Sequence, residues 1–201
     1  MKRYYLMLIL LIVLLGSCTS FHPRMLQPED NPIDNKILKL NVSSQNDVQR
    51  VSSEEYKEVG YQSLYYTIFE RELRQNILKN GNKDFGSIEL TIIYDKYTEH
   101  FGWEILSGST LLVFNVVGMP LDFVEQYTEV EIKLFDQTGK EIKRYNIIKE
   151  IKKYTGFYYN HKYSSMDVEE YVKVVAFKSI IKELKYKLSN DAVEINKILR
   201  S

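Results

Sequence analysis

The chain has 201 residues, and its 27 lysine and arginine residues are balanced by 27 aspartate and glutamate residues. This balance argues against a nucleic-acid-binding protein, which needs a basic stripe on its surface. The single cysteine, Cys18, excludes a body held together by internal disulfides. A domain of this length can bury enough surface to be stable without disulfides or metals.

The N-terminus has the pattern of an export signal that ends at the cysteine. Lys2 and Arg3 precede an almost unbroken aliphatic run over residues 6–15. That run is well short of the roughly 20 residues that a membrane-spanning helix requires. The sequence Leu15-Gly16-Ser17-Cys18 resembles the lipobox of bacterial lipoproteins. The resemblance implies cleavage before Cys18, and a diacylglycerol and an N-acyl chain attached covalently to that cysteine.

The same resemblance divides the chain into three parts. Residues 1–17 are expected to be a lipoprotein signal peptide, residues 18–35 a lipidated tether, and residues 36–201 a single domain. The segment 19–35 contains three of the four prolines and little apolar periodicity, as tethers do. Thr19, rather than aspartate, follows the cysteine. By the sorting rule of enteric bacteria, this favours the outer membrane, with the protein facing the periplasm.

The first half of the domain predicts a strand, a long helix and a second strand. The first strand is expected from Ile37 to Val42. A helix over residues 56–79 follows a cap at Ser52 or Ser53, and Asn80-Gly81 is expected to end it in a left-handed conformation. The apolar stripe of this helix comprises Val59, Tyr65, Tyr66, Phe69, Leu73 and Ile77. A second, half-buried strand is predicted by the alternation of Ile88, Leu90, Ile92 and Tyr94 with polar residues.

The most apolar stretch of the domain follows, over residues 101–120. It is too short and too interrupted for a comfortable membrane-spanning helix. Two interpretations stay open: a buried strand or short helix that closes the core, or an exposed loop that contacts a partner or the lipid interface. With two tyrosines from an aromatic loop before the last helix, the candidate contact residues are Trp103, Leu111, Leu112, Phe114, Val117, Met119, Tyr158 and Tyr159. The alternative for the tyrosine loop is a packed cover over the end of the sheet.

The second half of the domain predicts a hairpin and another long helix. Val130, Ile132 and Leu134 alternate with charged residues, and the loop 136–140 places Gly139 where a positive φ is wanted. The return strand passes through Ile142, Tyr145 and Ile147. A helix is expected over residues 168–188, with a break at 189–191, and residues 192–199 are a candidate for a further short helix. Its buried stripe is Val174, Phe177, Ile181, Leu184 and Leu188, which leaves Lys178, Lys182 and Lys185 in solvent.

The order β-α-β-β-β-α, with one apolar stripe on each helix, predicts an α+β fold. We expect a two-layer sandwich with both helices on one face of a four-stranded antiparallel or mixed sheet. In topology this resembles small envelope lipoproteins, among them the plug of the lipopolysaccharide translocon, and the N-terminal domain of the Tol-system propeller protein. The resemblance implies an accessory role in an envelope complex and assigns no functional residue.

Catalytic and metal-binding patterns are absent from the sequence. The histidines His22, His100 and His161 lack zinc-site spacing, and no serine lies in a nucleophile elbow. We therefore expect no enzyme, no metal and no cofactor beyond the acyl chains on Cys18. The predicted function is a membrane-anchored, non-catalytic accessory lipoprotein with an envelope protein as its partner. The alternatives are a carrier of a lipid or other apolar ligand, and a hydrolase of envelope material built around His100 or His161.

Overall fold

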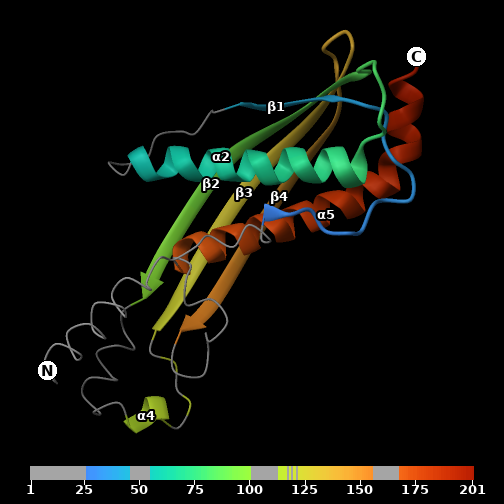
Figure 1. Cartoon of the computed structure of the whole chain (residues 1–201). Coiled ribbons are helices and arrows are strands. Elements are labelled where there is room, and N and C mark those ends of the chain that lie inside the picture. The colour runs from blue at the N-terminus through green and yellow to red at the C-terminus, as the bar shows by residue number, and fades with distance from the viewer. Residues whose placement is uncertain are drawn as a thin grey trace, which may run out of the picture.

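The computed structural model describes residues 26–45, 55–100, 113–116, 118, 120, 122–155 and 168–201, with the side chains of 45, 55–63, 114, 115, 122 and 155 left aside. Its elements in chain order are β1 (Asn41–Gln45), α2 (Glu55–Glu72), η2 (Leu73–Ile77), β2 (Gly86–His100), α4 (Val113–Val116), β3 (Asp122–Asp136), β4 (Glu141–Thr155) and α5 (Val168–Ile198). Figure 1 shows α2 and α5 together in front of one face of the sheet. The predicted α+β class and the order of elements are confirmed.

The four strands form one mixed sheet in the order β1-β2-β3-β4. The short β1 runs parallel to β2, whereas β2, β3 and β4 are antiparallel and 15 residues long each. The antiparallel pairing of β3 and β4 confirms the predicted hairpin, and Gly139 in its turn has a φ of 81°. The Asp136 carboxylate stabilises this turn by accepting hydrogen bonds from the backbone N–H groups of Thr138 and Lys140.

The core lies between the helices and one half of the sheet, which we call the proximal half: residues 86–92, 129–136 and 141–148. Its inward side chains are almost all apolar, as the sequence pattern predicted. They are Ile88, Leu90, Ile92, Val130, Ile132, Leu134, Tyr145 and Ile147, each 9% exposed or less. The described residues of the predicted helix stripes are buried against them, with Phe69 and Phe177 fully covered; Tyr66 is only partly buried, and the side chain of Val59 lies outside the described residues. The opposite, open face of the sheet carries Tyr94, Ile148 and Tyr154, each about half exposed or slightly less.

The last helix is longer than predicted. The break expected at residues 189–191 is wrong, because α5 continues as one helix through Ile198. Its final turns are buried against the core through Ala192 and Ile195. Asp191 is used within the fold, since its carboxylate accepts a 2.7 Å hydrogen bond from the Tyr145 hydroxyl. Packing of this apolar stripe therefore outweighs the weak helix propensity of the polar residues before it.

The end of the first helix also differs from the prediction. The chain leaves the helix at Ile77 through a π-helical turn, and Leu78 is already extended. Gly81 does not have a positive φ, so the expected glycine cap is wrong; the described glycines with positive φ are Gly118 and Gly139. The unpaired carbonyl groups at this helix end find partners elsewhere in the chain.

Those partners come from residues 26–40, which we call the strap. The carbonyl of Gln75 accepts from Lys36 Nζ at 2.8 Å, that of Asn76 from the N–H of Ile33 at 3.0 Å, and that of Ile77 from the N–H of Ile37 at 2.9 Å. Ile37 thus forms an isolated parallel bridge with Leu78, outside the sheet. The first strand begins at Asn41, four residues later than predicted. The strap therefore caps the helix, in place of the predicted glycine.

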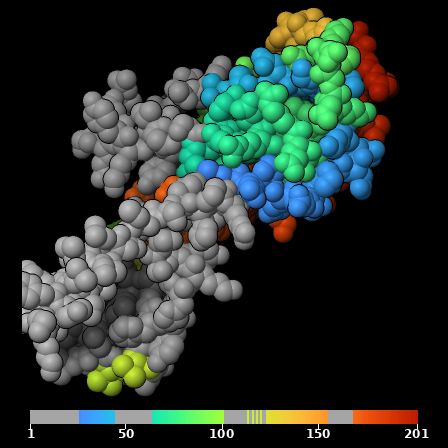
Figure 2. Space-filling model, viewed as in Figure 1, coloured from blue at the N-terminus to red at the C-terminus, as the bar shows by residue number. Residues whose placement is uncertain are grey.

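The strap is packed as part of the domain. Ile33 and Ile37 are buried, and Leu26 packs against the core. In Figures 1 and 2 the strap starts over the outside of the helix layer, between α2 and α5, and then passes around the helix ends toward β1. None of the helices in the described part of the chain is long and apolar enough to cross a membrane.

Candidate functional site

The remaining part of the sheet, residues 94–100, 122–128 and 149–155, forms what we call the distal half. In Figure 1 these strand ends run past both helices. The register pairs His100 of β2 with Phe123 of β3, and Phe123 with Tyr154 of β4. Strands β2 and β4 end here and β3 begins here, so the chain leaves or enters all three strands at the same end of the sheet. Both predicted contact segments, 101–120 and the tyrosine loop, are therefore attached to the same end of the sheet.

A row of rings crosses the open face at this end. The rings of His100 and Phe123 are stacked with centroids 4.3 Å apart, and the Tyr154 ring follows at 5.9 Å from Phe123. Beside the row, Glu125 lies 2.6 Å from Lys152 Nζ and 3.1 Å from His100 Nε2. The hydrogen bond from Lys152, and then the adjacent His100 ring, hold the pKa of the Glu125 carboxyl below its usual range.

The short helix α4 lies beyond the strand ends in Figure 1. Its two described side chains are apolar and exposed: Val113 at 60% and Val116 at 63%. Exposed apolar side chains grouped together are typical of interaction sites. Of the predicted contact residues, Phe114 lies in α4, but only its backbone is described. Outside the described residues lie Cys18, Trp103, Leu111, Leu112, Val117, Met119, Tyr158 and Tyr159.

A buried polar cluster lies where the distal half of the sheet meets the apolar core. The Asp95 carboxylate accepts hydrogen bonds from the hydroxyl of Tyr65 at 3.2 Å, Gln126 Nε2 at 2.5 Å and Thr128 Oγ1 at 2.8 Å. Lys173 Nζ is 3.9 Å from the same carboxylate and 2.8 Å from that of Glu169. Burial raises the pKa of Asp95, although Lys173 and the three hydrogen bonds oppose that rise. The cluster joins α2, α5, β2 and β3.

Sequence reasoning missed this cluster, although a signal for it was present. Gln126 and Thr128 have the same parity as Val130 in β3, and both are fully buried. Extending the alternation toward the N-terminus of the strand would have placed them inside. The Oε1 atom of Gln126 has no hydrogen-bond partner among the described residues. The cluster thus brings together two carboxylates, an ammonium group, an amide and two hydroxyl groups.

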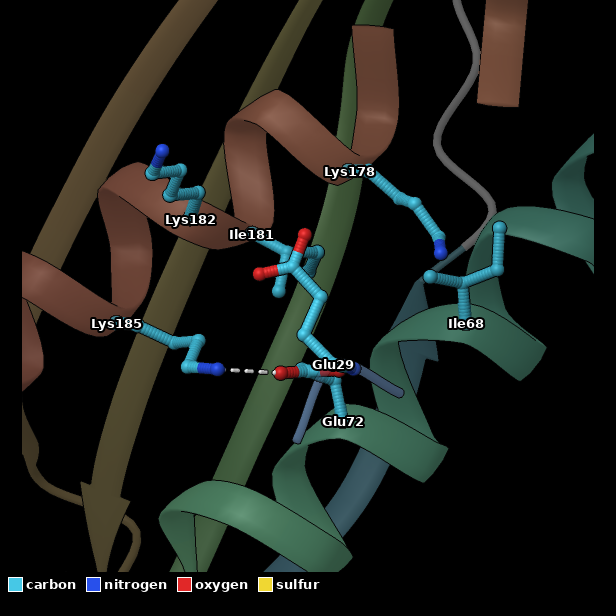
Figure 3. A pocket seen from close by; sticks show the side chains of 7 residues that line it. All are labelled: Glu29, Ile68, Glu72, Lys178, Ile181, Lys182 and Lys185. Carbon is cyan, nitrogen blue, oxygen red and sulfur yellow. Dashed lines mark hydrogen bonds and ion pairs between the residues drawn. The ribbon is translucent and has the colours of Figure 1, made fainter. Parts of the chain in front are cut away.

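A second polar centre lies in a groove between α2 and α5 (Figure 3). Its lining residues are Glu29, Ile68, Glu72, Lys178, Ile181, Lys182 and Lys185, and its cavity of about 10 Å³ admits about one water molecule. Lys185 Nζ donates to Glu72 Oε1 at 2.7 Å, and both side chains are less than a tenth exposed. The prediction that Lys185 is solvated is therefore wrong, because a carboxylate on the other helix pairs with it.

Among the described residues, no group of three or more histidine, cysteine, aspartate or glutamate side chains could hold a metal ion. His100 meets Glu125 on the open face of the sheet, where the neighbouring row is aromatic rather than nucleophilic. His22 and His161 lie outside the described residues.

Comparison with known proteins adds two solved structures. No family model matches the chain, and no curated protein matches it. It is similar to a minor lipoprotein from Acinetobacter baumannii, at 13% identity and a TM-score of 0.29, over 80% of this chain and 92% of that one. It is also similar to a Xanthomonas campestris protein of the DUF330 family, at 8% identity and a TM-score of 0.40, over 87% and 94% of the two chains. Similarities this low assign no function, so the function is argued from the residues of this chain.

Proposed function

We propose that the protein is a lipid-anchored envelope lipoprotein that acts as a non-catalytic accessory subunit. In this proposal the acyl chains on Cys18 hold it on the membrane, and the distal end of the sheet binds an envelope protein. The anchor is supported by the lipobox-like residues 15–18 and by an apolar run too short to span a bilayer. Two or more acyl chains are needed for stable anchoring, because one chain binds only marginally.

The observation that carries the binding role is the exposed apolar surface at the distal end. Val113 and Val116 are both more than half exposed on one short helix, next to the strand ends that carry the ring row. Covering an exposed valine side chain contributes roughly 1.5 kcal/mol, so two such contacts together correspond to roughly a hundredfold in affinity. The cavity in the α2–α5 groove is far too small for an acyl chain, which leaves the carrier alternative without support from that groove.

A crosslinking experiment in native membranes tests the binding role. A photo-reactive amino acid is placed at Val116, and as a matched control at Val193, which is 72% exposed but lies on α5. We expect Val116 to give an adduct with one envelope protein, identified by mass spectrometry, and Val193 to give none. Equal adducts at both positions, or none at Val116, would contradict the proposed contact surface.

The anchor is tested separately. The mature protein is expected to have the mass of residues 18–201 plus its acyl chains, and Cys18→Ser is expected to abolish both cleavage and acylation. An unmodified mature mass would overturn the lipoprotein assignment while leaving the contact surface standing.

A further inference from the structure

The chain enters the described domain on the side of the helices. Leu26 packs against the core, and the carbonyl of Gln27 accepts a hydrogen bond from Lys178 Nζ on α5 at 3.2 Å. Figure 2 shows the start of the strap at the surface of the molecule beside α2, and Glu29 of the strap lines the groove between α2 and α5. The open face of the sheet is on the opposite side of the molecule. Any anchor that precedes Leu26 is thus connected to the helix layer.

Several bonds fix this entry point. Asn76 Nδ2 donates to the carbonyl of Glu29 at 2.6 Å, and the N–H of Glu29 donates to Glu72 Oε2 at 3.2 Å. Asn76 Nδ2 also donates to Glu72 at 2.8 Å, and Lys185 pairs with that carboxylate from the other helix. The side chain of Ile33, seven residues after Leu26, is also buried. The first part of the strap is therefore held to both helices.

The length of chain between the anchor and the strap is short. Cys18 and Leu26 are eight residues apart, which spans at most about 28 Å when fully extended. A path from the outer surface of the helices to the open face must cover the thickness of the helix and sheet layers, about 20 Å. It must also run about 10 Å to the side to get around the edge of a four-stranded sheet. That path is about as long as the connection at full extension. A membrane that holds Cys18 can approach the helix layer with the connection relaxed, but it can lie against the open face only with the connection fully stretched.

We propose that the lipid anchor and the strap together hold the helix layer toward the membrane surface and turn the open face of the sheet away from it. This inference rests on the proposed acylation of Cys18. The occupant of the helix side is the lipid headgroup surface, to which the exposed Lys182 ammonium contributes a charge that anionic headgroups attract. Figure 3 shows the Lys182 ammonium pointing away from the groove. The open face, with its ring row, then remains accessible to a protein partner.

Labelling from two sides tests the orientation. Because Cys18 is the only cysteine and is consumed by acylation, single cysteines can be labelled selectively. Tyr186→Cys, 70% exposed on α5, reports on the helix side, and Ile148→Cys, 50% exposed on β4, reports on the open face. The acylated full chain is reconstituted into vesicles of phosphatidylethanolamine and phosphatidylglycerol that carry a headgroup-attached quencher. We expect at least about twofold stronger quenching at position 186, since about 20 Å of protein separates the two faces.

Equal quenching at the two positions, or stronger quenching at 148, would overturn the orientation. A second variant inserts about twelve glycine and serine residues between Met25 and Leu26, which lengthens the connection without touching the strap. Its two labels should be quenched almost equally, and an unchanged difference would show that the short connection does not set the orientation. Mass spectrometry of the same samples separates the two proposals. Unacylated Cys18 overturns the anchor and this inference together, whereas acylated protein with equal quenching overturns only the orientation.

Discussion

The proximal and distal halves of the sheet belong to the same three strands but differ in what faces inward. In the proximal half, Val130, Ile132 and Leu134 of β3 are completely buried under the helices. In the distal half, the same face of β3 carries Gln126 and Thr128, hydrogen-bonded to Asp95. The proximal half thus holds the fold together, and the distal half extends from it. One strand can do both because every second residue faces inward, and the inward residues can be apolar at one end of the strand and polar at the other.

The largest difference is expected when one aromatic ring is removed from each region. Phe177 is fully buried and stacks on Tyr65 with ring centroids 4.6 Å apart. Phe177→Ala should lower the free energy of unfolding by about 3–5 kcal/mol, because the cavity cannot close. Phe123→Ala, in the distal ring row, should cost roughly 1 kcal/mol. Urea unfolding followed by circular dichroism measures both, and similar losses would show that the two halves are equally part of the core.

Breaking the buried ion pair should have almost as large an effect. Glu72→Gln leaves Lys185 buried without a counter-charge, which costs about 3–5 kcal/mol in similar buried pairs. The double variant Glu72→Leu, Lys185→Met removes both charges and should recover most of that loss. Urea unfolding again gives the comparison. If the double variant is no more stable than the single one, the charge of Lys185 is not what makes the single variant unstable.

A smaller prediction contrasts two aspartates by pH. Hydrogen bonds from Tyr145 and then Lys143 lower the pKa of Asp191, so its contribution is present above the ordinary value of 3.8 and lost as pH falls below it. The pKa of Asp95 is raised, so the fold loses stability as pH rises from 3.8 through the folded-state pKa. Asp191→Asn should therefore be more destabilising at pH 7 than at pH 3, by about 1 kcal/mol. Asp95→Asn should show the opposite trend.

Measuring each variant against the wild type at the same pH cancels the titration of all other groups. Denaturant midpoints at several pH values between 3 and 7 provide the data. Trends of the same sign for Asp95→Asn and Asp191→Asn would contradict the distinction between the two carboxylates.

The smallest effects on stability are expected on the open face, where substitutions in the proximal and distal halves should have similarly small effects. Arg144 pairs with Glu141 and Glu131 in the proximal half, and Lys152 pairs with Glu125 in the distal half. These basic side chains are exposed to solvent, so Arg144→Ala and Lys152→Ala should each change the melting temperature only slightly, and by less at high salt. Thermal unfolding at low and high salt tests this. A large loss for either variant would mean that the open face also stabilises the fold.

Local periodicity predicted the features that depend on burial. The inward sides of α2, α5 and the hairpin follow from residues such as Phe69, Val174 and Ile132, because apolar spacing reports directly which side faces the core. The turn at Gly139 was predicted for a similar reason, since its positive φ favours glycine. These are local signals, and the structure confirms them.

Features set by distant partners could not be predicted in this way. Lys185 follows the spacing of a solvated lysine, and its partner Glu72 is 113 residues away. Likewise, Asn80-Gly81 has the composition of a helix cap, but the strap caps the helix from more than 35 residues upstream. The residues proposed for partner contact, from Trp103 to Tyr159, lie mostly outside the described part of the chain. For them the prediction rests on composition alone.

The strap has a consequence for the time course of folding. Asn196, near the end of α5, accepts a hydrogen bond from the N–H of Leu38 and donates one to the carbonyl of Lys36, across 158 and 160 residues. The first described segment is thus completed by a residue of α5 that is synthesised much later. Contacts this distant in sequence slow folding, since the intervening chain must be ordered first. During synthesis the strap therefore lacks these partners until α5 has been made, and a truncation of α5 would leave the strap without them.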